Sequence, residues 1–292
     1  MGARDLPTPV ALPTRAGAEA REYEFQERDF ARVREMIYRR AGISLNENKQ
    51  NMVYSRLSRR LRVLGMRSFG EYLDRIESDA QFGMAEAQEF VNALTTNLTS
   101  FYREAHHFPV FEEFLRASGG APKVWCAAAS TGEEPYCIAM TMVEAAGSRP
   151  PGSLLASDID TNVLATASRG CYRLEAAQAC GEARLRRFFL RGRGAQEGLV
   201  RVRPELVQMI RFAQQNLLDE TWHVVQSFGP KLDAVFCRNV MIYFDRKTQK
   251  QILERISQVL RPGGLLFVGH SENFTDCHEA LVLRGKTVYL RK

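Results

Sequence analysis

The fold of this chain is decided by the stretch Lys123-Val-Trp-Cys-Ala-Ala-Ala-Ser-Thr-Gly-Glu-Glu-Pro-Tyr136. A short apolar run, Val124 to Cys126, is followed by small residues up to Gly132 and then by apolar residues at helical spacing. This order predicts a strand, a tight turn and a helix. The small side chains of the turn leave room for a ligand to approach the backbone at the start of the helix.

Two acidic residues of this stretch indicate which ligand fits. Phosphate groups at the start of the helix would be repelled by Glu133 and Glu134, whereas a ligand with a positive centre and ribose hydroxyls would be held by them. A nucleoside without phosphates therefore fits better than a dinucleotide. The alternative is helix capping, either by Thr131 with Glu134 in a capping box or by Glu134 itself with Pro135 at the first helical position.

Size and composition exclude several classes of protein. With 292 residues, the chain is long enough for two domains and a large core. It contains no apolar run of 18 residues and no signal peptide, so we expect neither membrane insertion nor secretion. Its six cysteines form no C-x-x-C pair, which argues against a metal site and for reduced thiols in a cytoplasmic protein.

The first third of the chain predicts a leader and a helical domain. Residues 1–22 are rich in Ala, Pro, Gly and Arg without periodicity, as is typical of a flexible leader. Residues 23–93 contain four segments with helical periodicity; Gly42 and Gly65 end the first two, and a Ser68–Glu71 capping box opens the third. We expect residues 94–120 to form a linker and a connecting helix, and residues 121–292 to form an α/β domain.

Positive charge is concentrated in the helical domain. Residues 28–67 contain eleven Arg or Lys against three acidic residues, a local charge of +8 compared with +6 for the whole chain. Such a surface attracts nucleic acid, anionic lipid or an acidic protein helix. The segment lacks the interleaved aromatic residues of a base-stacking platform, which argues against nucleic acid. An acidic protein partner and a merely solvated helix face both stay open.

The second half of the chain alternates strands with helices, the pattern of a mostly parallel sheet covered on both faces. One strand ends at Asp158, where open sheets of this kind bind ribose hydroxyls; the alternative is helix capping by Asp158 or Asp160. Polar residues that follow other strands, such as Asn216 and Asn239, are expected to converge on the same crevice.

An interruption of the alternation at residues 184–208 predicts a small antiparallel β insert. The exposed edge of such an insert can accept an extended peptide as an additional strand.

Six runs of the sequence together resemble one known family: TTNLTSFYREAHHF, AAASTGEEPY, ASDID, RGRGAQEGLVRVRPEL, FCRNVMIYFD and GHSENF. Over residues 23–292 the chain is similar to the chemotaxis receptor glutamate methyltransferases, which use S-adenosylmethionine. The resemblance implies an α/β fold like that of class I methyltransferases: a doubly wound, mostly parallel sheet with an N-terminal all-α domain and a small antiparallel β insert.

The resemblance also implies a set of site residues. The residues that line the cofactor site would be Asn97, Thr99, Arg103, Glu134, Asp158, Asn216, Leu217, Arg238 and Asn239. Arg103 and Tyr243 would flank the transferred methyl group and the substrate carboxylate, and they are the expected catalytic residues. Substrate binding would involve the second helix and the β insert, through Arg56, Arg59, Arg60, Arg62, Arg193, Gly194 and Arg201.

The partners implied by the resemblance are the cytoplasmic helices of chemoreceptors and a tether peptide at a receptor's C-terminus. The product would be S-adenosylhomocysteine, and we expect a monomer that binds no nucleic acid. Two alternatives stay open, namely a methyltransferase that acts on RNA and a non-catalytic module that senses a nucleoside.

The expected chemistry requires placement of the reactants more than activation of the acceptor. A glutamate with a pKa of about 4.3 is ionised at neutral pH, so it attacks a sulfonium-bound methyl group without a general base. We therefore expect Arg103 to orient a carboxylate and Tyr243 to contact the methyl-bearing centre. Plain packing of Tyr243 in an apolar run stays the alternative.

Overall fold

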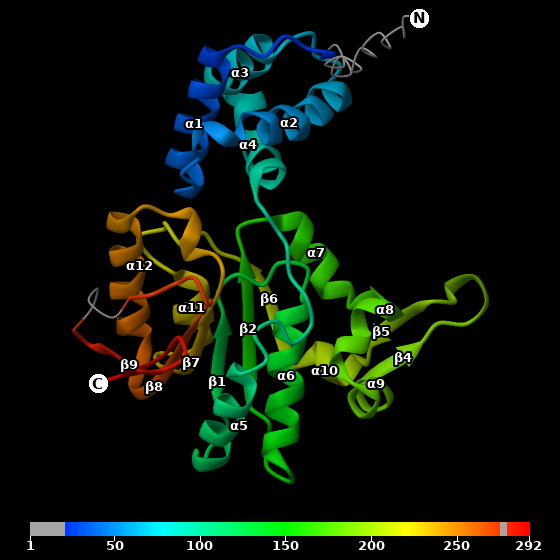
Figure 1. The fold of residues 1–292 in the computed structure, drawn as a ribbon, viewed down its shortest axis with the longest axis vertical. Coiled ribbons are helices and arrows are strands. Elements are labelled where there is room, and N and C mark those ends of the chain that lie inside the picture. Colours follow the sequence, from blue (N-terminus) through cyan, green and yellow to red (C-terminus); the bar gives the residue numbers. More distant parts are fainter. Residues whose placement is uncertain (1–20, 275–278) are drawn as a thin grey trace, which may run out of the picture.

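The computed structural model describes residues 21–274 and 279–292 (Figure 1). Almost all of the predicted leader, residues 1–22, lies outside the described residues. A helical domain sits at one end of an α/β domain, and the chain after helix α4 joins the two. Among the described residues, no helix has both the length and the apolar character that crossing a membrane requires.

Four α-helices form the first domain: α1 (Glu27–Ala41), α2 (Gln50–Leu64), α3 (Phe69–Ser78) and α4 (Ala80–Leu94), with the short 3-10 helix η1 (Glu47–Lys49) before α2. Their apolar faces meet in one core that contains Val33, Leu57 and Phe90. The predicted ends of the first two helices are confirmed, because Gly42 and Gly65 adopt the left-handed conformation that terminates α1 and α2.

The second domain is built on a seven-stranded sheet with the order β6-β2-β1-β7-β8-β10-β9. The strands are β1 (Lys123–Cys126), β2 (Ser153–Asp158), β6 (Ile210–Gln214), β7 (Leu232–Cys237), β8 (Leu260–Val268), β9 (Leu281–Gly285) and β10 (Val288–Arg291). β6, β2, β1, β7 and β8 are parallel, and β10 is antiparallel to both of its neighbours. The strand order reverses between β1 and β7, and such a switch point is where open sheets bind ligands.

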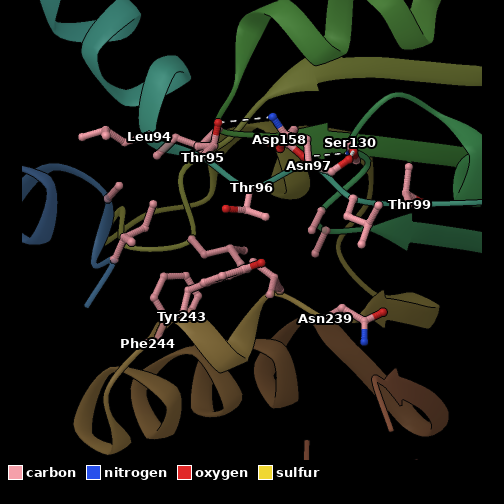
Figure 2. A pocket seen from close by; sticks show the side chains of 18 of the residues that line it. Leu94, Thr95, Thr96, Asn97, Thr99, Ser130, Asp158, Asn239, Tyr243 and Phe244 are labelled. Carbon is pink, nitrogen blue, oxygen red and sulfur yellow. Dashed lines mark hydrogen bonds between the residues drawn. The ribbon is translucent and has the colours of Figure 1, made fainter. Parts of the chain in front are cut away.

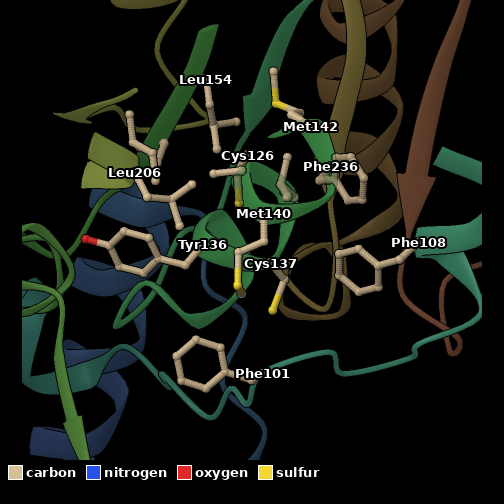
Figure 3. Close-up of a cluster of buried hydrophobic side chains, with 14 of the residues drawn as sticks. Phe101, Phe108, Cys126, Tyr136, Cys137, Met140, Met142, Leu154, Leu206 and Phe236 are labelled. Atoms are coloured by element: carbon tan, nitrogen blue, oxygen red, sulfur yellow. The ribbon is translucent and has the colours of Figure 1, made fainter. Parts of the chain in front are cut away.

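Helices cover both faces of this sheet, which confirms the doubly wound class. They are α5 (His107–Ala117), α6 (Glu133–Ala146), α7 (Thr161–Arg169), α10 (Pro204–Gln208), α11 (His223–Phe228) and α12 (Arg246–Val259). Alternate residues of β1 enter different cores: Val124 and Cys126 pack with α5 and α6, as Figure 3 shows for Cys126, whereas Trp125 packs with α11 and α12.

A separate three-stranded antiparallel sheet confirms the predicted β insert. Its strands are β3 (Cys171–Arg173), β5 (Leu199–Val202) and β4 (Phe189–Arg191), in the order β3-β5-β4. Between them lie the short helices α8 (Leu174–Ala177), η2 (Gln178–Cys180), α9 (Glu182–Phe188) and η3 (Gly194–Gln196). The predicted range 184–208 contains β4 and β5 but not β3, which is too short for a periodic signal and follows α7 directly.

Candidate functional site

A cleft lies between the helical domain and the carboxyl ends of the parallel strands (Figure 2). It encloses about 1220 Å³ of empty space with its open mouth included. Figure 2 shows Asn97, Ser130 and Asp158 on one side and Asn239 and Tyr243 on the other. The structure brings every expected cofactor and catalytic residue to this cleft: Asn97, Thr99, Arg103, Glu134, Asp158, Asn216, Leu217, Arg238, Asn239 and Tyr243.

The small-residue turn before α6 forms part of the cleft wall. Gly132, the N-cap of α6, has φ = 100°, and a Cβ at this position would lie 2.6 Å from the Tyr172 hydroxyl and 2.8 Å from the Ala167 side chain. Glycine is therefore required by both conformation and space. Ser130 donates its hydroxyl to the backbone oxygen of Asn97, which ties the turn to the linker between the domains.

Both capping alternatives for this turn are wrong. Gly132 is the N-cap, and the Thr131 hydroxyl donates to the carboxylate of Glu133 instead of capping the helix. The Glu134 carboxylate accepts a hydrogen bond from Arg238 at the end of β7. Glu134 is thus directed toward the cleft wall and away from the orphan amides of its own helix.

Asp158, the last residue of β2, is a buried carboxylate with defined partners. It accepts hydrogen bonds from the backbone amides of Ser130 (2.8 Å) and Asp160 (3.0 Å). Burial raises the pKa of Asp158 to about 6. The capping alternative holds for Asp160, whose carboxylate accepts from the amides of Asn162 and Val163. It does not hold for Asp158, which lines the cleft.

Arg238 joins two acidic residues beneath the cleft. Its guanidinium is 1% exposed, donates to Glu134 and lies 3.2 Å from the carboxylate of Glu104. It also donates to the backbone oxygen of Arg103 at 2.5 Å. Two carboxylates thus face this guanidinium, and Glu134, which lines the cleft, offers negative charge to a positively charged ligand.

The two expected catalytic residues approach the cleft from different segments. The Arg103 side chain donates to the backbone oxygen of Leu98 at 2.9 Å. Tyr243 closes the 3-10 helix η4 (Met241–Tyr243), and its backbone oxygen accepts from the amide of Ser44 at 2.9 Å. Its side chain also packs against the core of the helical domain. Tyr243 therefore both lines the cleft and contributes to packing.

Two arginines of α2 that were expected to contact substrate are engaged inside the helical domain. Arg56 donates to the backbone oxygens of Leu94 (3.0 Å) and Thr95 (2.5 Å) at the end of α4. Arg60 pairs with Glu86, which is only 3% exposed. Their partners give Arg56 and Arg60 a structural role that the sequence did not indicate.

The other residues expected to contact substrate lie on the surface. Arg59 is exposed, and Arg62 is exposed while paired with Glu22. In the β insert, all three expected residues, Arg193, Gly194 and Arg201, are exposed. None of the seven expected substrate residues lines the cleft itself.

The helical domain supplies part of the cleft that the sequence did not predict: Ala41, Ile43, Ser44, Leu45, Lys49 and Met52. Helical periodicity ends at Gly42, so the next residues read as an ordinary connection. A signal was present in Ile43 and Leu45, because apolar side chains in a short polar connection need a surface to pack on.

The residues of the cleft fit S-adenosylmethionine. Asp158 offers a carboxylate to paired hydroxyls, Leu217 an apolar surface, and the guanidinium of Arg103 suits a carboxylate. The carboxylate of Glu134 suits a positive centre. No group of three or more His, Cys, Asp or Glu that could hold a metal ion occurs in residues 21–274 and 279–292.

Comparison with known proteins agrees with this assignment. Residues 97–290 match the family described as CheR methyltransferase, SAM binding domain, and residues 28–95 match CheR methyltransferase, all-alpha domain. The chain is 52% identical to the chemotaxis protein methyltransferases of Salmonella typhimurium and Escherichia coli over 261 residues each. These matches cover 89% of this chain and 88% and 89% of those proteins. It is 50% identical to chemotaxis protein methyltransferase 2 of Pseudomonas aeruginosa, over 92% of this chain and 94% of that protein. The chain therefore belongs to the CheR methyltransferase family and has both its all-α and its S-adenosylmethionine-binding domains.

Proposed function

We propose that this protein transfers the methyl group of S-adenosylmethionine to glutamate side chains of chemoreceptors and produces glutamyl methyl esters. One observation carries the proposal. In a chain of this family, a single cleft gathers all nine expected cofactor residues together with Tyr243.

The residues of the cleft suit a reaction that depends on placement. When bound, S-adenosylmethionine supplies a methyl group on a positively charged sulfur. A glutamate acceptor with a pKa of about 4.3 is already ionised, so the protein needs no general base.

Arg103 is proposed to orient a carboxylate in the cleft. Arg103 is partly buried, and its guanidinium donates to the backbone oxygen of Leu98. A guanidinium has five N–H donors, so others stay available for a carboxylate. Tyr243 is proposed to contact the methyl-bearing centre. Arg103 should not pair too tightly with the acceptor, because that would stabilise the ground state and slow the attack.

Two surfaces are proposed to bind the receptor. The exposed Arg59 and Arg62 on α2 would attract acidic receptor helices. In the β insert, β4 pairs only with β5 among the described strands, so its free edge can accept a tether peptide near Arg193. We further propose that the protein acts as a monomer in the cytoplasm, and its four buried, unpaired thiols at Cys126, Cys137, Cys180 and Cys237 suit a reducing compartment.

The test is incubation with methyl-labelled S-adenosylmethionine and membranes that contain chemoreceptors. We expect label on the receptor that alkali releases, as it does from an ester. Arg103→Ala should lower turnover by about 100-fold without unfolding the protein, whereas Arg186→Ala, at an exposed site in the β insert, should change nothing. Alkali-stable label, label on RNA with a steep salt dependence, or binding without consumption would contradict the proposal.

A further inference from the structure

The segment after β7 places Asn239 at the cleft in a conformation that needs support. Asn239 has φ = 57°, in the left-handed region that non-glycine residues rarely adopt. Its backbone amide donates to the buried carboxylate of Glu272 at 3.0 Å, and the amides of Met241 and Gly269 donate to the same carboxylate at 2.8 and 2.5 Å. The backbone of this turn is thus fixed by one buried acid.

A second acid, Glu104, fixes the side chain of Asn239. The Nδ2 of Asn239 donates to Oε1 of Glu104 at 3.1 Å. A Cβ at Gly269 would lie 2.3 Å from that Nδ2, so the glycine leaves the space that the amide group occupies. Because Nδ2 is the donor to Glu104, Oδ1 is the acceptor of the amide, and no described residue donates to it. Asn239 lines the cleft, so Oδ1 suits an ammonium or hydroxyl group of a ligand.

Glu104 also connects two other segments. The backbone amide and Nδ1 of His270 lie 3.2 and 2.9 Å from its Oε1, and its Oε2 lies 3.2 Å from the guanidinium of Arg238. Arg238 in turn donates to the backbone oxygen of Arg103. Burial alone would raise the pKa of Glu104, but the hydrogen bonds from His270 and Asn239 and the charge of Arg238 lower it to about 2. Glu104 is therefore charged at physiological pH.

We propose that Glu104 is a positioning residue of the cleft, which holds the Asn239 amide with its oxygen free for the ligand and fixes Arg238 beneath the Arg103 backbone. The inference rests on the proposed function, because it names a residue that acts through the cofactor site. Glu104 acts through its neighbours, since it is not among the residues that line the cleft.

The test is a double-mutant cycle between Glu104→Gln and Asn239→Ala. Glutamine keeps an acceptor oxygen but removes the charge that faces Arg238. Because its side chain also has an NH₂ group, the amide of Asn239 is no longer held in one orientation. We expect Glu104→Gln to lower both the methyl-transfer rate and the affinity for S-adenosylhomocysteine by about 10- to 100-fold in the wild-type background, because small displacements in a site have effects of this size. In the Asn239→Ala background the same change should cost clearly less than in the wild-type background, because only the contact with Arg238 is then lost.

Controls separate positioning from a loss of fold and from a failure of the proposed function. Glu112→Gln, which breaks a surface pair with Arg116 on α5, should leave rate and affinity unchanged. Thermal unfolding shows whether each variant is folded. If Glu104→Gln does not fold, Glu104→Asp takes its place. Aspartate keeps the charge, but its shorter side chain withdraws the oxygen from Asn239. Additive losses, or wild-type values in the folded Glu104 variant, would overturn the inference. A wild-type protein that binds S-adenosylhomocysteine but methylates no receptor would contradict the proposed function alone, since the cycle can still be measured by calorimetry.

Discussion

At the scale of single residues, the burial of Asp158 predicts ligand binding that depends on pH. Its pKa of about 6 lies above the ordinary value because the buried carboxylate is poorly solvated. Hydroxyl donors prefer the ionised form, so binding requires loss of the proton. At pH 5 only about one tenth of Asp158 is ionised, and the affinity for S-adenosylhomocysteine should be about 10-fold lower than at pH 7.5.

Calorimetry at the two pH values checks this prediction. Asp158→Asn should bind weakly at both pH values and lose the pH dependence, whereas Asp74→Asn, at an exposed position of α3, should retain it. If the affinity of the wild-type protein does not change between pH 5 and 7.5, Asp158 has only a structural role, in which its carboxylate accepts the hydrogen bond from the Ser130 amide.

Long motif runs predicted which residues line the cleft, but not which partners they have. Helix capping stayed an alternative for Glu134 because capping is a local pattern, while its real partner, Arg238, is 104 positions away. Glu104 was missed for the same reason: in the sequence it is one carboxylate in a polar loop, and only the fold brings His270 and Asn239 to it. Partners that are distant in sequence leave no periodic signal.

At the scale of the element, α2 shows that a row of arginines is not a uniform charged face. Arg60→Ala should lower the free energy of unfolding by about 3 kcal/mol, because it leaves the buried Glu86 without its ion-pair partner. Arg59→Glu should change stability by less than about 0.5 kcal/mol, as exposed substitutions usually do, but it should slow receptor methylation. Urea unfolding and receptor methylation at low salt separate the two effects. Equal losses of stability in both variants would refute this division of roles.

At the scale of the whole molecule, the cleft exists because the two domains are docked directly on each other. Tyr38 on α1 donates to Asp245 at 2.6 Å, and Asn216 after β6 donates to the backbone oxygen of Arg40 at 2.8 Å. Sequence periodicity predicted both domains but not this contact, since each pattern describes how a segment packs within its own core. The lining from residues 41–52 follows from the docking and was therefore missed as well.

Gly42 and Gly65 make it possible to test this docking with a matched pair of substitutions. Both glycines end a helix in the left-handed conformation, so alanine costs about 1 kcal/mol of backbone strain at either position. A Cβ at Gly65 meets nothing within 4 Å, whereas a Cβ at Gly42 would lie 2.9 Å from Leu218 and 3.1 Å from Phe244, which lines the cleft.

The two variants should therefore lose similar backbone stability, but only Gly42→Ala should displace the Phe244 ring. Overpacking of this kind typically costs about 1–3 kcal/mol of folding stability. Because Phe244 lines the cleft, Gly42→Ala should also weaken S-adenosylhomocysteine binding, while Gly65→Ala keeps wild-type affinity. Equal affinities in calorimetry would mean that the contact between the domains does not shape the cofactor site.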